Sequence, residues 1–349
     1  MLKFNIKKKL KSNRNIILCT SLLSIPFTIS LIEKSSESST IITQSKEIYK
    51  FLVKFYPKLD IIFIEHLRSL TNKNLLKMIK NIHYNYLLKK KLNFLLIKYS
   101  NSIVFTNIKA FSPLLGYALL VLSKKNIIYH QTLVKVFWKN AKPNLKQKIL
   151  KIYYKIMFGL DFDVVSTQMN NYILSYSKKF FKKIKAKKIS NKINSNMIKK
   201  FFARNLSIHN NNNILLLSSG ISIKNGLIDK KLFNDFMKKW SSTSSFKRLT
   251  LKRKSFSEKK YYKEKALAEV PLQIPANLLV YGYKIVIGYN SATLFEAANK
   301  YCKAISLLHL LSKNALVIDN YKNYLNNNLL KNKKIFYPKT YEQFIKCYK

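Results

Sequence analysis

Short runs of β-branched and apolar residues alternate along this chain with longer stretches in which apolar residues recur at helical spacing. Helical spacing covers Ser45–Phe55, Leu75–Leu96, Pro113–Leu122 and Asn144–Phe158. The strands predicted between these stretches are Ile16–Thr20, Ile41–Thr43, Ile61–Ile64, Ile103–Thr106, Ile127–Tyr129 and Asp163–Ser166. Alternation of this kind predicts βαβ units around a parallel sheet.

A stretch rich in lysine and asparagine, residues 178–213, interrupts the alternation and predicts a helix followed by a linker. A second set of strands then follows at Ile214–Ser218, Leu249–Lys252, Lys284–Ile287, Ala304–Leu307 and Leu316–Ile318. We therefore predict two Rossmann-like α/β domains with parallel sheets. Their expected bounds are residues 1–195 and 214–337, with a linker over 196–213 and a C-terminal helix over 338–349.

The N-terminus permits two interpretations. A basic start is followed by an apolar run over residues 15–32, as in a signal peptide or a membrane anchor. The run is short for a membrane span and is interrupted by hydroxyl side chains and Pro26. We favour a strand, a turn and a helix, with an N-terminal anchor at 15–32 as the alternative.

The segment from Lys284 to Leu307, KIVIGYNSATLFEAANKYCKAISL, carries the clearest signal for a ligand site. It predicts a buried strand that ends at Gly288, a turn with a helix N-cap at Asn290 and Ser291, a helix, and a second strand. In α/β proteins the carboxyl end of a parallel strand, followed by a helix N-terminus, is a common place for phosphate or nucleotide.

Three further side chains suit a nucleotide at this place. Ser291 and Thr293 supply hydroxyls, and the Glu296 carboxylate is positioned to accept hydrogen bonds from a ribose diol. The loop Ser218-Ser219-Gly220 also follows a buried strand and would present N–H groups to a phosphate. The simpler alternative is a capped helix and an ordinary turn, with Glu296 in solvent.

Composition narrows the class of protein. With 48% hydrophobic residues in 349 the chain is not disordered. The net charge of +50 comes almost wholly from lysine, which the codon bias of an AT-rich genome largely explains. The charge still draws the protein toward anionic membranes. Arginine is scarce and no nucleic-acid-binding motif is present, so we do not expect a nucleic-acid partner.

The cysteines and histidines indicate neither a metal site nor a disulfide framework. The three cysteines lie far apart and the five histidines form no cluster with them. We therefore expect no bound metal and a reducing, cytoplasmic location.

Three segments resemble bacterial sialyltransferases and polysialyltransferases of the GT-B class: residues 14–34, 214–240 and 285–307. The resemblance implies two Rossmann-like domains facing across a cleft, with the donor nucleotide held mainly by the second. It also implies inverting, metal-independent transfer of an acidic sugar from a CMP-linked donor to a cell-surface glycan or glycolipid, without a cofactor. The enzyme would work at the cytoplasmic face of the inner membrane, as a peripheral protein.

The chain departs from that family at its catalytic motifs. The family's acidic pair followed by glycine is replaced in NIIYHQTL, which leaves His130 and Glu65 as candidates for the base. No His-Pro pair exists, and the corresponding strand, RLTLKRKSF, offers Lys252 and Lys254 as phosphate contacts. Two alternatives follow: an inactive binding or assembly protein with this fold, or a transferase that uses a different nucleotide sugar.

Overall fold

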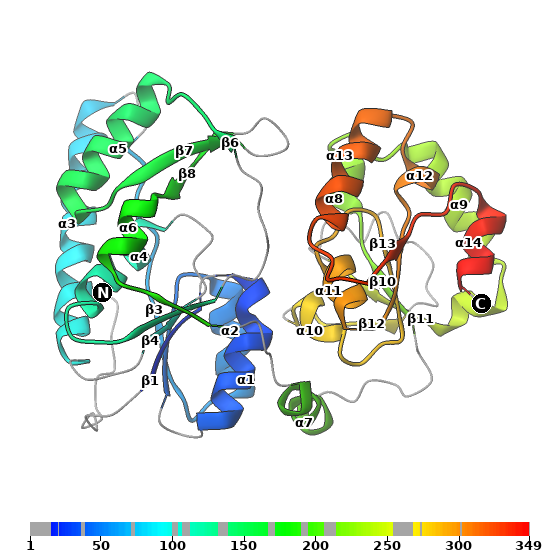
Figure 1. Ribbon diagram of the computed structural model, residues 1–349, viewed down its shortest axis with the longest axis horizontal. Coiled ribbons are helices and arrows are strands. Elements are labelled where there is room, and N and C mark those ends of the chain that lie inside the picture. Colours follow the sequence, from blue (N-terminus) through cyan, green and yellow to red (C-terminus); the bar gives the residue numbers. More distant parts are fainter. Residues whose placement is uncertain are drawn as a thin grey trace. The chain divides into compact units, whose positions relative to one another are not determined.

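The computed structural model describes the chain from Asn15 to Tyr348 with gaps. The described residues are 15–19, 21–35, 39–70, 74–99, 104–106, 112–131, 139–166, 172–189, 195–205, 214–253, 268–272, 274–300 and 302–348. The chain divides into two compact units. The first comprises Met1–Ser24 and Leu31–Lys192, and the second comprises Ile25–Ser30 and Ile193–Lys349. The stretch predicted as a linker contains a helix, α7 (Ser195–Asn205), which is drawn in dark green in Figure 1.

The first unit is built on a six-stranded sheet in the order β3-β2-β1-β4-β5-β9, in which every pairing is parallel. Its strands are β1 (Asn15–Cys19), β2 (Ser39–Thr43), β3 (Asp60–Phe63), β4 (Val104–Thr106), β5 (Ile128–Gln131) and β9 (Lys187–Ile189). Numbered along the chain within this sheet, the order is 3-2-1-4-5-6, that of a Rossmann fold.

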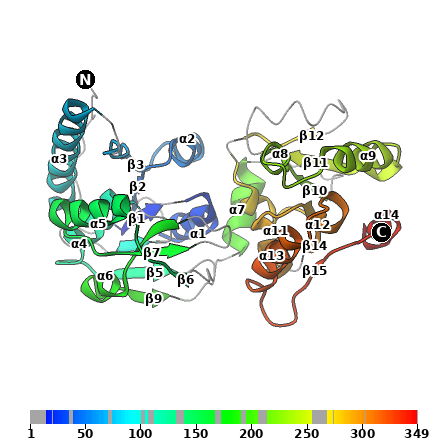
Figure 2. The ribbon, with the colours of Figure 1, turned by 90° about the horizontal axis from the view of Figure 1, so that it is seen from above.

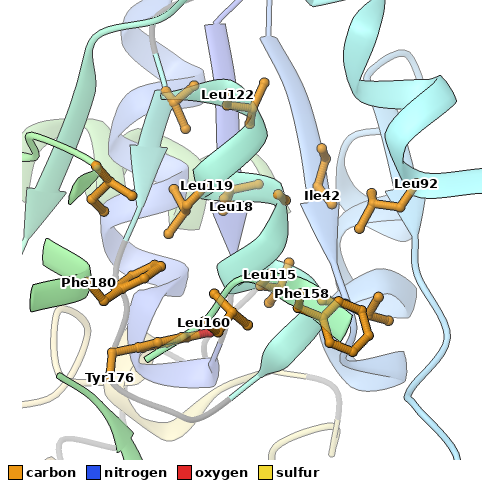
Figure 3. Packing of buried hydrophobic residues seen from close by; sticks show 14 of the residues in the cluster. Leu18, Ile42, Leu92, Leu115, Leu119, Leu122, Phe158, Leu160, Tyr176 and Phe180 are labelled. Carbon is orange, nitrogen blue, oxygen red and sulfur yellow. The ribbon is translucent and has the colours of Figure 1, made fainter. Parts of the chain in front are cut away.

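Helix α1 (Ile25–Ser35) is divided between the units, since Ile25–Ser30 falls in the second and the rest in the first. The other helices of the first unit are α2 (Lys46–Phe55), α3 (Leu75–Ile97), α4 (Pro113–Leu122), α5 (Leu145–Phe158) and α6 (Lys178–Lys183). Five begin at a side-chain cap, where Ser45, Asn74, Ser112, Asn144 or Ser177 accepts a hydrogen bond from a backbone N–H. The predicted helices in this half of the chain are therefore confirmed. Figure 3 shows the hydrophobic core of the first unit. Leucines of α4 pack there between the sheet and the aromatic side chains of Phe158, Tyr176 and Phe180.

One predicted strand belongs to a different sheet. Asp163–Ser166 lies in β7 (Phe162–Ser166), which pairs antiparallel with β6 (Lys139–Asn140) and β8 (Tyr172–Tyr176). The prediction of a parallel strand here was wrong. An apolar run does not encode the direction of its partner, and the connection between β7 and β8 is too short for a parallel crossover.

The second unit repeats the first architecture. Its sheet has the order β12-β11-β10-β13-β14-β15, again all parallel and again 3-2-1-4-5-6. The strands are β10 (Ile214–Leu217), β11 (Leu249–Lys252), β12 (Ala268–Glu269), β13 (Ile285–Gly288), β14 (Lys303–Ser306) and β15 (Ile335–Phe336). The helices are α8 (Gly220–Lys224), α9 (Lys230–Ser241), α10 (Ala276–Leu279), α11 (Thr293–Asn299), α12 (Leu308–Leu311), α13 (Ala315–Asn326) and α14 (Tyr341–Tyr348). Figure 2 shows them around the sheet.

The predicted strand Leu316–Ile318 is wrong, because these residues form the first turn of α13. The Asn314 side chain accepts a hydrogen bond from the backbone N–H of Val317 and so starts a helix. A run of three apolar residues is too short to separate a strand from a buried helical turn. The outer strand of the sheet is β15 instead.

Residues 15–19 and 21–32 form the predicted strand, turn and helix: β1, a 3-10 turn at Leu22–Ser24 and the start of α1. Within the described part of the chain, no helix combines the length and the apolar character needed to cross a membrane. The predicted fold class, α/β with two Rossmann-like parallel-sheet domains, is confirmed. Two such units in one chain are consistent with the GT-B architecture.

Candidate functional site

The second sheet changes its direction of growth between β10 and β13. From β10 the chain adds β11 and β12 on one side, and then adds β13, β14 and β15 on the other. In open α/β sheets ligands bind outside the carboxyl ends of the strands at this point. The register pairs Leu216 with Ile287, so the loops that begin at Ser218 and Tyr289 leave the same edge of the sheet together. Both predicted loops therefore lie at the switch point.

Gly288 allows the two strands to approach closely at this edge. A Cβ atom at residue 288 would lie 3.2 Å from the Cβ and 3.3 Å from the Cδ1 of Leu217. The next residue, Tyr289, is buried, and both its side chain and its backbone are hydrogen-bonded. The Tyr289 hydroxyl donates to the Leu227 carbonyl (2.8 Å), and its own carbonyl accepts from the Ser306 hydroxyl (2.7 Å). The backbone that precedes Asn290 and Ser291 is thus held rigidly.

A side-chain hydrogen bond connects the two loops. The Ser222 hydroxyl, on α8, donates to Asn290 Oδ1 at 3.4 Å. The Asn290 side chain also donates a hydrogen bond to the hydroxyl oxygen of Tyr321, on α13. Neither Ser222 nor Tyr321 was predicted as part of the site. Ser222 carries a weak sequence signal, since it lies two residues after Gly220 on a very short helix, whereas nothing local marks Tyr321.

Ser291 is not the N-cap of α11, contrary to the prediction. The cap position is Ala292, which offers no side-chain hydrogen bond, and the helix begins at Thr293. The Ser291 hydroxyl instead accepts a long hydrogen bond (3.4 Å) from the Thr293 backbone N–H. Ser291 is half-buried and Thr293 is buried. The Ser291 O–H hydrogen is not used in that bond and can be donated.

The loop after β10 is packed more tightly than the one after β13. Ser218 and Ser219 are 4% and 7% exposed, and Gly220 is buried. The Ser218 N–H donates to the Lys252 carbonyl (2.9 Å), and the Ser219 carbonyl accepts from Ile223 N–H (3.0 Å). The backbone N–H of Ser218 is thus occupied within the protein.

Glu296 carries the most perturbed carboxyl group of the site. The residue is half-buried as a whole, but its Oε2 is fully buried and accepts no hydrogen bond from any described residue. Burial raises the pKa of the carboxyl to about 8, and the positive charge of Lys300 partly opposes the shift. Tyr281 and Tyr324 are its other electrostatic neighbours. A buried oxygen with unused hydrogen-bonding capacity suits a polar ligand group.

The Lys252 ammonium group is hydrogen-bonded within the protein. The residue is 6% exposed, and its ammonium group donates to the carbonyls of Arg253 (3.0 Å), Leu272 (3.1 Å) and Pro271 (3.4 Å). These bonds fix the loop after β12, so we do not carry Lys252 into the proposed site. Arg253 pairs with Glu269. Lys254, the other predicted phosphate contact, lies outside the described residues.

The two candidate bases of the first unit lie apart. Three strands separate β3, which precedes Glu65, from β5, which contains His130, or roughly 19 Å at about 4.8 Å per strand. The Glu65 carboxylate accepts a hydrogen bond from the Tyr84 hydroxyl on α3, and this bond raises the pKa of Tyr84. The His130 ring packs on Phe181 of α6, with centroids 5.4 Å apart.

Comparison with known proteins gives no family. No family model matches the sequence, and no curated protein matches it. Among the described residues, no group of three His, Cys, Asp or Glu side chains is placed to hold a metal ion.

Solved structures show distant likenesses. The glycosyltransferase VinC in complex with DTDP is 8% identical, with a TM-score of 0.46 over 88% of this chain and 84% of VinC. A 2,6-sialyltransferase from Photobacterium sp. JT-ISH-224, solved with CMP and lactose, is 11% identical, with a TM-score of 0.46 over 93% and 78%. A UDP-N-acetylglucosamine 2-epimerase described from Listeria monocytogenes is 10% identical, with a TM-score of 0.41 over 91% and 89%. The sialyltransferase is thus one likeness among several GT-B enzymes, and our fold assignment depends on the strand order alone.

Proposed function

We propose that the protein is a glycosyltransferase that binds a nucleotide sugar at the carboxyl ends of β10 and β13. One observation carries the proposal: at the switch point of a 3-2-1-4-5-6 sheet, the loops after these two strands are hydrogen-bonded to each other through Ser222 and Asn290. A ligand at this edge would meet polar groups from both loops.

In this proposal the site residues have distinct roles. Ser291 donates its hydroxyl to the nucleotide, and Gly220 and Thr293 shape the loops that surround the phosphate. Glu296 binds the ribose diol, for which its buried Oε2 has unused capacity. A bound diol replaces the water that burial removed, so nucleotide binding should lower the pKa of Glu296 from its raised value.

The reaction we propose is an inverting transfer of an acidic, sialic-acid-like sugar from a CMP-linked donor to a glycan or glycolipid. The acceptor hydroxyl attacks the anomeric carbon, its proton passes to a base, and the bond to the phosphate breaks, releasing CMP. Glu65 and His130 are alternatives for the base rather than a pair, because of their separation on the sheet. Glu65→Gln and His130→Asn should identify which one, by a loss of kcat with KM for the donor unchanged.

Calorimetry with purified protein and CMP-, UDP- and DTDP-linked sugars tests the proposal. We expect heat of binding with a CMP-linked acidic sugar and weaker binding of the others. Binding of a UDP- or DTDP-linked sugar alone would support a transferase with a different donor. If none of these compounds binds, a site for CMP-, UDP- or DTDP-linked sugars is excluded.

A second function deserves a separate test, because the Glu65 carboxylate is already bonded to Tyr84 and the family's acidic pair is missing. We propose as the alternative a binding or assembly protein that retains the nucleotide site without catalysis. Donor binding without release of CMP, measured with a mixture of glycan acceptors, would favour that alternative. Steady release of CMP coupled to a lengthened acceptor would exclude it.

A further inference from the structure

The outer face of α5 carries an apolar stripe that nothing in the described chain covers. Leu145, Ile149, Ile152 and Ile156 follow one another at spacings of four, three and four residues, so they lie on one side of the helix. They are 75%, 57%, 60% and 81% exposed. The opposite side of α5 packs into the core through Phe158. The helix therefore has two apolar sides, one packed in the core and one exposed.

The neighbouring helix α3 shows the same pattern. Its buried side is marked by Asn81, Asn85, Leu92 and Leu96. Its exposed large apolar side chains are Leu75, Leu76, Ile79, Tyr86, Leu87, Phe94 and Ile97. Two hydrogen bonds hold the helices side by side: Asn85 Nδ2 to the Tyr153 hydroxyl (3.2 Å), and Lys89 Nζ to the Met157 carbonyl (2.5 Å). Figures 1 and 2 both show them as neighbours.

The charged residues of α3 and α5 themselves are all lysines. Neither α3 nor α5 contains an aspartate or glutamate. On α5 the exposed Lys148 and Lys155 fall along one edge of the stripe and Lys146 along the other, at 100° per residue. On α3 the ammonium groups of Lys90 and Lys98 lie 5.0 and 5.1 Å from the ring centroids of Tyr86 and Phe94.

We infer that the exposed faces of α3 and α5 form a docking surface for an anionic lipid bilayer. Apolar side chains bordered by lysines are the composition with which an amphipathic helix lies in a membrane interface, its apolar side among the acyl chains and its ammonium groups at the phosphates. A second copy of the chain does not fit this surface, because stacking stripe on stripe would bring the bordering lysines together in a protein of net charge +50.

The inference rests on the proposed function in one respect, since a glycolipid acceptor would bring the protein to a membrane. What it adds is the surface of the protein that contacts the lipid. A charged protein without this surface would associate with lipid through diffuse attraction alone, which salt removes. With the stripe inserted, part of the binding should survive at high salt.

Sedimentation of the full chain with vesicles tests the inference. We expect binding to vesicles of 70% phosphatidylcholine and 30% phosphatidylglycerol and little binding to pure phosphatidylcholine. The triple variant Ile149→Ser, Ile152→Ser, Ile156→Ser should bind the anionic vesicles at least about tenfold more weakly. The matched control is Leu316→Ser with Leu330→Ser, which removes exposed apolar side chains from the second unit and should change nothing.

The lysines are tested in the same way. Lys148→Gln with Lys155→Gln should weaken vesicle binding by about fivefold per lysine. The control Lys230→Gln with Lys231→Gln makes the same change in net charge on exposed residues of α9 and should have a clearly smaller effect.

Three outcomes would overturn the inference: equal losses in the test and control variants, equal binding to neutral and anionic vesicles, or a dimer that the triple variant converts to a monomer. Calorimetry with the nucleotide sugar separates this test from the proposed function. Vesicle binding without nucleotide-sugar binding would leave the docking surface standing and exclude the transferase. Binding of the nucleotide sugar without vesicle binding would exclude the docking surface and leave the transferase standing.

Discussion

The ring of Tyr176 occupies the space that a side chain at residue 116 would need. A Cβ on Gly116 would lie 2.6 Å from both Cε1 and the hydroxyl oxygen of Tyr176. The ring is buried, stacks on Phe180 with centroids 4.5 Å apart, and donates its hydroxyl to the Ser112 carbonyl. Gly116 thus lets α4 and the antiparallel sheet come into contact, although glycine weakens a helix.

We therefore predict that Gly116→Ala destabilises the protein, by about 1–3 kcal/mol from overpacking. In an exposed helix the same change would stabilise by about 1 kcal/mol. Urea denaturation measures the difference. In the double variant Gly116→Ala, Tyr176→Leu the two changes should couple favourably, because the smaller side chain frees the space. Additive losses would show that the ring is not the obstacle.

Glu296 should make stability depend on pH. Its carboxyl has a pKa raised to about 8 in the folded protein, so between about 4.3, the unfolded value, and 8 the folded state holds more protons than the unfolded state. The free energy of unfolding then falls as pH rises through this window. Below this pH window the carboxyl is protonated in both the folded and the unfolded state and adds no pH dependence to stability.

Glu296→Gln removes that dependence. We expect the free energy of unfolding of the variant to match that of the parent near pH 4.5 and to exceed it by up to about 5 kcal/mol near pH 8.5. Lys300, whose pKa is lowered chiefly by burial, acts in the opposite direction at higher pH, so both proteins should be compared below pH 9. Parallel pH profiles from chemical denaturation would contradict the assignment of a buried, protonated carboxyl.

Ser291→Ala tests the nucleotide site. If its hydroxyl contacts the donor, binding should weaken by about 1–2 kcal/mol in calorimetry, with the melting temperature almost unchanged. Ser241→Ala is the matched control. It removes a hydroxyl at the end of α9 that donates to the Lys238 carbonyl, and it should leave donor affinity as it is.

Lys252→Met separates a structural lysine from a phosphate contact. Because the ammonium group serves the carbonyls of Arg253, Pro271 and Leu272, its loss should lower the free energy of unfolding by about 1–3 kcal/mol. Lys238→Met, at an exposed position on α9, should cost little. A variant of normal stability that binds donor poorly would return Lys252 to the site.

Most of the parallel strands were predictable because a strand buried on both faces is a continuous apolar run that needs no knowledge of its partners. The short edge strands β9, β12 and β15 were not predicted. The apolar pattern does not predict the direction in which a strand pairs with its neighbour. Phe162–Ser166 and Tyr172–Tyr176 are also apolar runs, yet only the short connection between them indicates an antiparallel pair. Leu316–Ile318 shows the other limit, since a side-chain cap at Asn314 outweighs the run that follows.

The candidate site was also predictable only in part. The sequence places Gly288, Asn290 and Ser291 at a strand end, and the fold brings them beside Ser218 because the strand order makes β10 and β13 neighbours. Which atoms each side chain meets is not encoded locally. The same composition that suggested Lys252 as a phosphate contact is compatible with a buried ammonium group bonded to three carbonyls.

The position of β9 has a consequence for synthesis on the ribosome. β9 completes the first sheet beside β5, but the whole antiparallel sheet and two helices come between them in the chain. At roughly 5–20 residues per second, the open edge of β5 waits about 3–11 s for its partner to emerge. An unpaired edge can recruit other nascent chains during that delay. Once β9 arrives, the exposed Lys187 and Lys188 stand on the new outer edge, where their charge discourages further strand addition.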